Sequence, residues 1–183
     1  DGTELLADCA NGLARIGRIV ADLKSFSNVD RPPTERANLH ACLEHAVSVA
    51  SSPLPPGVTL KTALHPLPLL ACNPGHLNLV FLSLIKNGMQ AVQDSGRPGE
   101  VSIRSEAAPD GITIRITDTG VGMSPAQQER AFEPFYTTRA IGAGTGLGLS
   151  TARNIVLAHR GRIVLDSTPG KGTTVSLFFP GTP

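Results

Sequence analysis

A cluster of glycines lies directly before a segment with the apolar periodicity of a helix, and it limits the possible folds of this chain more than any other feature. Its four members fall within seven positions: Gly142, Gly144, Gly146 and Gly148. Backbone without side chains can fold over an anion and present N–H groups to it, and the start of the next helix attracts negative charge. The cluster therefore predicts a flexible flap over phosphate groups rather than a simple solvent loop.

The common phosphate-binding loops do not fit these glycines. The dinucleotide pattern GxGxxG lacks its third glycine at each start, where Pro125, Leu147 or Leu149 stands instead. The P-loop pattern fails because Lys171 is followed by Gly172 and not by Ser or Thr. A Rossmann site, a P-loop NTPase and the glycine loop of protein kinases are therefore disfavoured.

The rest of the pattern mixes helices with hairpin-connected strands. Helical periodicity or capping signals mark four segments: 38–50, 74–94, 124–131 and the segment that follows the glycine cluster and ends at His159. Period-two alternation marks five strands, and a sixth, short edge strand is expected beside Pro68: 58–63, 67–71, 101–104, 112–117, 162–166 and 173–179. We expect an α/β fold, a two-layer α/β sandwich with a mixed sheet and helices on one face.

Residues 1–30 carry a separate helical pattern. Apolar side chains recur at spacings of three and four: Leu6, Cys9, Leu13, Ile16, Val20 and Leu23. Pro32 and Pro33 then stop the helix. We therefore expect a protruding long helix over 1–30, packed on another chain or on its own domain, a linker over 31–37, and a globular domain over 38–183.

Composition excludes other classes. The 16 Lys and Arg balance 15 Asp and Glu, a net charge of +1, which argues against a nucleic-acid partner bound through a large basic face. Three dispersed cysteines cannot build a disulfide framework and favour a reducing compartment. No apolar run reaches the ~18–20 residues of a membrane span. We expect a cytoplasmic location, within a parent protein that membrane segments could still anchor.

A carboxylate and two glycines end one of the predicted strands. Asp118 at a strand end can accept a hydrogen bond from the exocyclic amine of adenine, whereas guanine presents an acceptor there. Gly120 and Gly122 let the backbone approach a base where a Cβ would clash. The alternative is a simple strand-ending turn.

Asn87 and the aromatic segment 132–138 are weaker signals. An amide oxygen on an apolar helix suits Mg²⁺, which takes few protein ligands besides phosphates and water. Gly88 beside it costs about 1 kcal/mol in a helix interior, so its presence indicates a close neighbour. Phe132 and Phe135 are expected to anchor the base of the flap, although ordinary core packing also explains them.

In chain order, these elements resemble the N, G1, F and G2 boxes of the ATP-binding domain of two-component sensor histidine kinases. The resemblance covers about 38–180 and implies the Bergerat (GHKL) fold, with ATP and Mg²⁺ held between helices under a mobile lid. The ATP-binding residues that it implies are Asn87, Asp118, Gly120, Gly122, Arg139, Gly142, Gly144, Thr145, Gly146, Leu147, Gly148 and Thr173. Within that set, Asp118 would bind the adenine amine and Asn87 would ligate the metal.

The resemblance also implies partners. Residues 1–30 are similar to the second helix of the dimerisation and phosphotransfer hairpin, so a homodimer through residues 5–29 is expected. The intact protein would transfer the γ-phosphoryl of ATP to a histidine and then to an aspartate on the receiver domain of a response regulator.

Three positions depart from the family pattern. Ser83 stands where many members carry a second asparagine, Gly88 replaces the usual alanine, and Arg160 stands where many members have glycine. We expect Ser83 to weaken nucleotide affinity. None of the five histidines is followed by the acidic residue and proline of the family's phosphoacceptor, so we expect that histidine to lie outside this chain and these five to be surface or helix-end residues.

Two other functions fit the same resemblance. A regulatory module could sense ADP and ATP without phosphoryl transfer, as Ser83 would suggest. An ATPase of the same fold would need a glutamate on the helix of Asn87 to activate water, yet residues 74–93 contain no acidic side chain. The sequence therefore favours the histidine kinase.

Overall fold

The computed structural model describes residue 17 and residues 35–139 and 144–181. Of residues 1–30, only Gly17 is described, so the long helix and the dimer contact expected there lie outside the described residues. Gly142 of the glycine cluster lies outside them as well.

The described residues form the expected α/β sandwich with a mixed sheet. Its strands follow the order β2 (Val58–Leu64), β4 (Gly99–Ala108), β5 (Gly111–Asp118), β7 (Gly172–Pro180) and β6 (Arg162–Thr168). The pair β2–β4 is parallel and the other three pairs are antiparallel. Strand β5 pairs with β7, and this pairing places its last residue, Asp118, opposite Thr173 near the start of β7.

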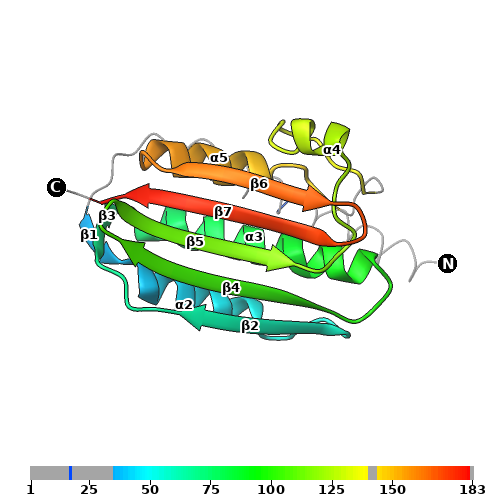
Figure 1. The fold of residues 1–183 in the computed structure, drawn as a ribbon, viewed down its shortest axis with the longest axis horizontal. Helices are drawn as coiled ribbons and strands as arrows, with labels where there is room; N and C mark the ends of the chain where they lie inside the picture. The colour runs from blue at the N-terminus through cyan, green and yellow to red at the C-terminus, as the bar shows by residue number, and fades with distance from the viewer. Residues whose placement is uncertain (1–16, 18–34, 140–143, 182–183) are drawn as a thin grey trace.

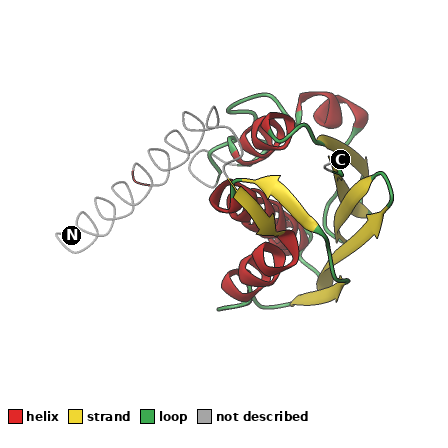
Figure 2. Ribbon diagram, turned by 90° about the vertical axis from the view of Figure 1, so that its left-hand side faces the viewer, coloured by secondary structure: helices red, strands yellow, loops and turns green. Residues whose placement is uncertain are grey.

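Three helices cover one face of this sheet: α2 (Leu39–Ala50), α3 (Pro74–Asp94) and α5 (Gly148–Ala158). The short α4 (Pro125–Arg130) lies apart from them, near the β6 edge (Figures 1 and 2). The two long helices begin as predicted, since Asn38 and Asn73 accept hydrogen bonds from the first backbone N–H groups. The capping box of Ser124 and Gln127 is also confirmed.

A second sheet corrects two expectations. Strands β1 (Glu35–Asn38) and β3 (Leu69–Cys72) pair antiparallel, separately from the main sheet. Residues 35–37, expected in the linker, are therefore part of a strand. The strand expected over 67–71 begins only after Pro68, because proline has no N–H to donate to a strand ladder. This strand pairs with β1.

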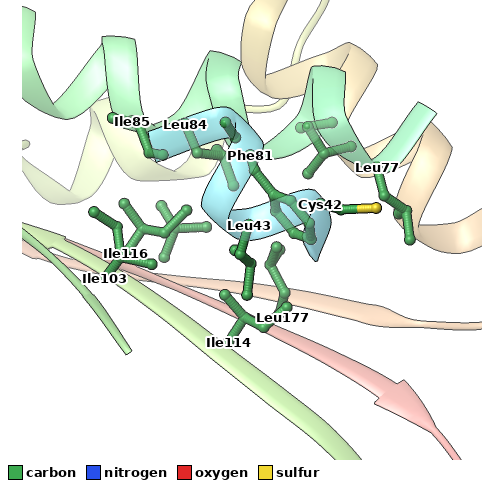
Figure 3. Packing of buried hydrophobic residues seen from close by; sticks show 14 of the residues in the cluster. Cys42, Leu43, Leu77, Phe81, Leu84, Ile85, Ile103, Ile114, Ile116 and Leu177 are labelled. Atoms are coloured by element: carbon green, nitrogen blue, oxygen red, sulfur yellow. The ribbon is translucent and has the colours of Figure 1, made fainter. Parts of the chain in front are cut away.

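The core lies between the helices and the sheet. The stripe predicted on α3 is buried in full: Leu77, Val80, Phe81, Leu84, Ile85, Met89 and Val92. Figure 3 shows Phe81 among Leu43 of α2 and Ile114 and Leu177 of the sheet. Each large side chain of this kind contributes about 1.5–3 kcal/mol when fully buried, so α3 is firmly held and can position polar groups on its remaining face.

His159 is one of the histidines expected at the surface or at a helix end, and it follows the last residue of α5. Its side chain is buried at the end of α5, where Nδ1–H donates to the Ile155 carbonyl (2.7 Å) and Nε2 accepts from the Asn73 backbone N–H (3.0 Å). The imidazole thus joins the end of α5 to the start of α3. The next residue, Arg160, has φ 57°, a left-handed conformation in which glycine is the usual residue.

None of the helices within the described part of the chain is both long and apolar enough to cross a membrane.

Candidate nucleotide-binding site

A cleft of about 500 Å³ opens between α3, the ends of β5 and β7, and the start of α5. Its volume lies within the range of small-molecule sites. Nine of the residues predicted to bind ATP line it: Asn87, Asp118, Gly122, Arg139, Gly144, Thr145, Gly146, Gly148 and Thr173. The fold thus brings together segments that are far apart in the chain.

One face of α3 forms a wall of the cleft. Side chains four residues apart lie on the same face of a helix, and Leu79, Ser83, Asn87 and Ala91 line the cleft in this spacing. The Asn87 amide has no hydrogen-bond partner among the described residues, so its oxygen is available to a ligand. Lys86 lines the same wall and is exposed.

Asp118 is the buried carboxylate of the cleft, 8% exposed. Its Oδ1 accepts a hydrogen bond from the Gly120 backbone N–H (2.8 Å). Burial raises the pKa of this carboxyl group, and hydrogen bonds from the backbone of Gly120 and Thr173 partly offset the rise. Gly88 lets the end of β5 lie close to α3, because a Cβ on Gly88 would lie 3.3 Å from the Asp118 Cβ.

Gly120 does not line the cleft, contrary to its predicted contact with the base. It is buried against the end of α3, where a Cβ would lie 2.7 Å from that of Ala91. Glycine is required here by the close packing against Ala91. Gly122 does line the cleft, with φ 64°, and a Cβ there would overlap the Thr168 carbonyl.

The described end of the glycine flap is fixed to the segment before it. Gly146 has φ 67°, and its carbonyl accepts from the Phe135 N–H (3.0 Å). Gly148 opens α5 against α3, since a Cβ there would lie 2.8 Å from Ser83 Oγ. Leu147 between them is buried and does not line the cleft; it lies in the contact between α3 and α5.

The two predicted aromatic anchors behave differently. Phe132 is half-buried and lies 5.4 Å from the Arg153 guanidinium of α5. The Phe135 ring is 63% exposed, so the anchor at this position is the backbone bond to Gly146 rather than the ring.

Arg139 is at the rim of the cleft, but its first partner is a carboxylate. Its Nε donates to Asp94 Oδ2 (3.1 Å), and Gln90 Nε2 donates to the other oxygen (3.1 Å). The ion pair joins the end of α3 to the segment before the glycine flap. Sequence reasoning did not find Asp94, because its spacing of seven residues from Asn87 gains meaning only once α3 is seen to line a cleft.

The donor set around Asn87 fits Mg²⁺ bound together with phosphates rather than a metal held by protein alone. No cluster of three metal-binding His, Cys, Asp or Glu side chains occurs in the part of the chain that the structure describes. Mg²⁺ characteristically keeps few protein ligands and completes its shell with phosphate oxygens and water. One unpartnered amide oxygen in a large cleft meets that requirement.

Sequence reasoning missed other lining residues. Lys86, Gln127, Tyr136 and Thr138 line the cleft from α3, α4 and the segment that follows α4. Lys86 could have been found, since it lies beside Asn87 on a helix whose apolar face was already assigned. The others come from a segment whose path the sequence does not fix.

The buried carboxylate, the glycine-rich rim and the five-stranded mixed sheet define a class, that of the α/β ATP-binding domains. The family model described as histidine kinase-, DNA gyrase B-, and HSP90-like ATPase matches residues 72–183, and the chain belongs to that family.

The chain is also similar to curated proteins named as sensor kinases. The sensor histidine kinase ZraS of Escherichia coli (strain K12) is 32% identical over 168 residues, which cover 91% of this chain and 35% of that protein. The sensory histidine kinase/phosphatase NtrB of Escherichia coli O157:H7 is 34% identical over 154 residues, 78% of this chain and 43% of that protein. This chain spans about a third of ZraS. The family is the one that the sequence predicted, and the curated relatives named here are sensor histidine kinases.

Solved structures share the fold. The Acinetobacter baumannii histidine kinase AdeS matches with a TM-score of 0.78 at 21% identity, over 98% of this chain and 85% of that one. Full-length ShkA, solved in complex with AMPPNP, matches with a TM-score of 0.76 at 21% identity, over 98% of this chain and 39% of that one.

Proposed function

We propose that this chain binds ATP with Mg²⁺ and transfers the γ-phosphoryl group to a histidine supplied from outside its own residues. The observation that carries the proposal is the meeting of Asp118, Asn87 and the glycine flap around one cleft. A related fold in ShkA was solved with the nucleotide analogue AMPPNP.

Each part of the cleft has a role in this reaction. The Asp118 carboxylate accepts a hydrogen bond from the adenine amine. The Asn87 amide oxygen is the protein ligand to the Mg²⁺ that accompanies the phosphates. The N–H groups of the glycine flap and the start of α5 face the phosphate chain, and Lys86 and Arg139 add positive charge at the rim.

In the transfer step, the bond between the γ-phosphorus and the bridging oxygen of ADP breaks, and a phosphorus–nitrogen bond to the acceptor imidazole forms. Phosphoryl transfer needs mainly positioning and neutralisation of charge. This cleft would supply both, and the acceptor imidazole would be the nucleophile.

The partners follow from the same proposal. Residues 1–30 would be the second helix of the hairpin and form a homodimer through residues 5–29, with a linker that ends before β1. A receiver-domain aspartate of a response regulator would take the phosphoryl group next. The module would act in the cytoplasm, where ATP is available.

A transfer assay tests the proposal directly. The chain is mixed with labelled ATP, Mg²⁺ and a separate hairpin that carries an acceptor histidine, and the label on the hairpin is measured. We expect transfer in the wild type and a loss of roughly a hundredfold or more in Asn87→Ala and in Asp118→Asn, because each removes a group that holds the nucleotide.

Asn154→Ala is the matched control, because Asn154 lies on α5 without lining the cleft. It should transfer at the wild-type rate. Unchanged transfer in the Asn87 and Asp118 variants would refute the residue roles, and rapid ATP hydrolysis without the hairpin would refute the kinase.

A further inference from the structure

Ser167 is a buried side chain near the end of β6, 9% exposed, that does not line the cleft. Its hydroxyl joins β6 to two other segments, the turn after β5 and the start of β7. It accepts a hydrogen bond from the Met123 backbone N–H (2.8 Å), donates to the Gly172 carbonyl (3.0 Å), and lies 2.8 Å from Thr173 Oγ1. The turn after β5 and the starting residues of β7 therefore meet at one hydroxyl group.

The direction of the third bond follows from counting protons. A serine hydroxyl has one proton to donate and two lone pairs to accept with. The proton goes to the Gly172 carbonyl, which can only accept, and one lone pair takes the Met123 N–H. For all three contacts to be hydrogen bonds, the remaining lone pair accepts from the Thr173 Oγ1–H, since the 2.8 Å contact itself allows either atom as donor.

Thr173 therefore has no proton left for the cleft that it lines. Its Oγ1 offers lone pairs alone, and its residue stands opposite Asp118 in the β5–β7 ladder. This end of the cleft presents two acceptors, the Asp118 carboxylate and the Thr173 hydroxyl oxygen.

We propose that Ser167 is a positioning residue for purine selection, which acts by fixing Thr173 as an acceptor. An exocyclic amine at position 6 of a purine has N–H groups for such acceptors, whereas a 6-oxo group brings its own lone pairs against them. The inference rests on the proposed function, since it assigns the base that the cleft takes.

The test measures dissociation constants for ATP and for inosine triphosphate, which carries oxygen in place of the 6-amine. The comparison uses the wild type, Ser167→Ala, Thr173→Val and the double variant, in the presence of Mg²⁺. The wild type should prefer ATP. Ser167→Ala frees the Thr173 proton to turn toward a 6-oxo group, so the preference for ATP should fall about fivefold or more.

The other variants separate positioning from general damage. Thr173→Val removes the hydroxyl but leaves Ser167 its other two bonds, so it should also lower the preference for ATP even where Ser167→Ala folds poorly. In the Thr173→Val background, Ser167→Ala should change the preference no further, because its effect passes through Thr173. Ser176→Ala, on the opposite face of β7, should behave as wild type.

Two results would overturn the inference: equal weakening of both nucleotides by Ser167→Ala with the preference unchanged, or an unchanged preference in Thr173→Val. A wild type that binds neither nucleotide would instead refute the proposed function and this inference with it.

Discussion

Asp118 has two conflicting demands on it. Ligand binding requires an ionised acceptor in the cleft, yet burial penalises the charge and raises the pKa of the carboxyl group, with two backbone hydrogen bonds as partial compensation. A folded-state pKa above the unfolded value means that the folded protein binds a proton more readily than the unfolded chain. Stability is then lost as pH rises between the two values, and the cost persists at neutral pH.

Asp118→Asn should therefore stabilise the protein without nucleotide. Asparagine keeps an oxygen for the Gly120 N–H but carries no charge to bury. We expect the melting temperature at pH 7 to rise by about 2–4 °C, the effect of roughly 1 kcal/mol in a domain of this size. The gain should shrink as pH falls through the ordinary aspartate pKa near 4, below which the wild-type carboxyl is protonated in both states. A lower melting temperature for the variant at pH 7 would contradict this assignment.

At the residue scale, side chains with a chemical signature were predictable and backbone roles were not. Asp118 and Asn87 line the cleft as their chemistry suggested. Gly120 and Leu147 fit the motif equally well but face α3. A motif shows which residues occur together in a sequence. Whether each of them faces the cleft or the core depends on tertiary packing.

At the scale of elements, the flap depends on its connection to the segment around Phe135. Gly146 is left-handed, and a Cβ there would lie 2.6 Å from the Phe135 carbonyl oxygen, so no side chain fits without a backbone shift. The same movement would break the hydrogen bond between the two residues.

Gly146→Ala should therefore weaken both stability and ATP affinity. Gly96→Ala is a matched control, because Gly96 has φ 68° and open space around its Cβ direction. Gly96→Ala should lose about 1–2 kcal/mol from left-handed strain alone and bind ATP normally. Denaturant unfolding and ATP titration of the two variants measure the difference. Equal losses of stability and affinity in both would show that the contact with Phe135 contributes nothing.

Elements were predictable where periodicity and caps agree. The helices α2 and α3 begin at the predicted caps, and the β4–β5 hairpin spans the predicted turn. The pairing of β1 with β3 was not predictable, because four-residue strands carry little periodicity and their partners are distant in the chain. The ion pair between Arg139 and Asp94 was also missed, because the two residues are far apart in the chain and meet only at the rim of the cleft.

At the scale of the whole molecule, the order of motifs identified the family, and the structure explains why that order suffices. The sheet order places the end of β5 beside β7, and α3 crosses behind both strands, so three distant motifs meet at one cleft (Figure 1). A net charge of +1 is compatible with this arrangement, because backbone N–H groups and Mg²⁺ rather than a basic face would balance the phosphates.

Calorimetric titration of the chain with ATP in the presence of Mg²⁺ measures whether the cleft binds nucleotide and whether Asp118 holds it. We expect saturable binding at one site, weakened by about tenfold or more in Asp118→Asn, which loses a charged acceptor, and unchanged in Asn154→Ala. Absence of binding by the wild type, or equal affinity in the wild type and Asp118→Asn, would contradict this expectation.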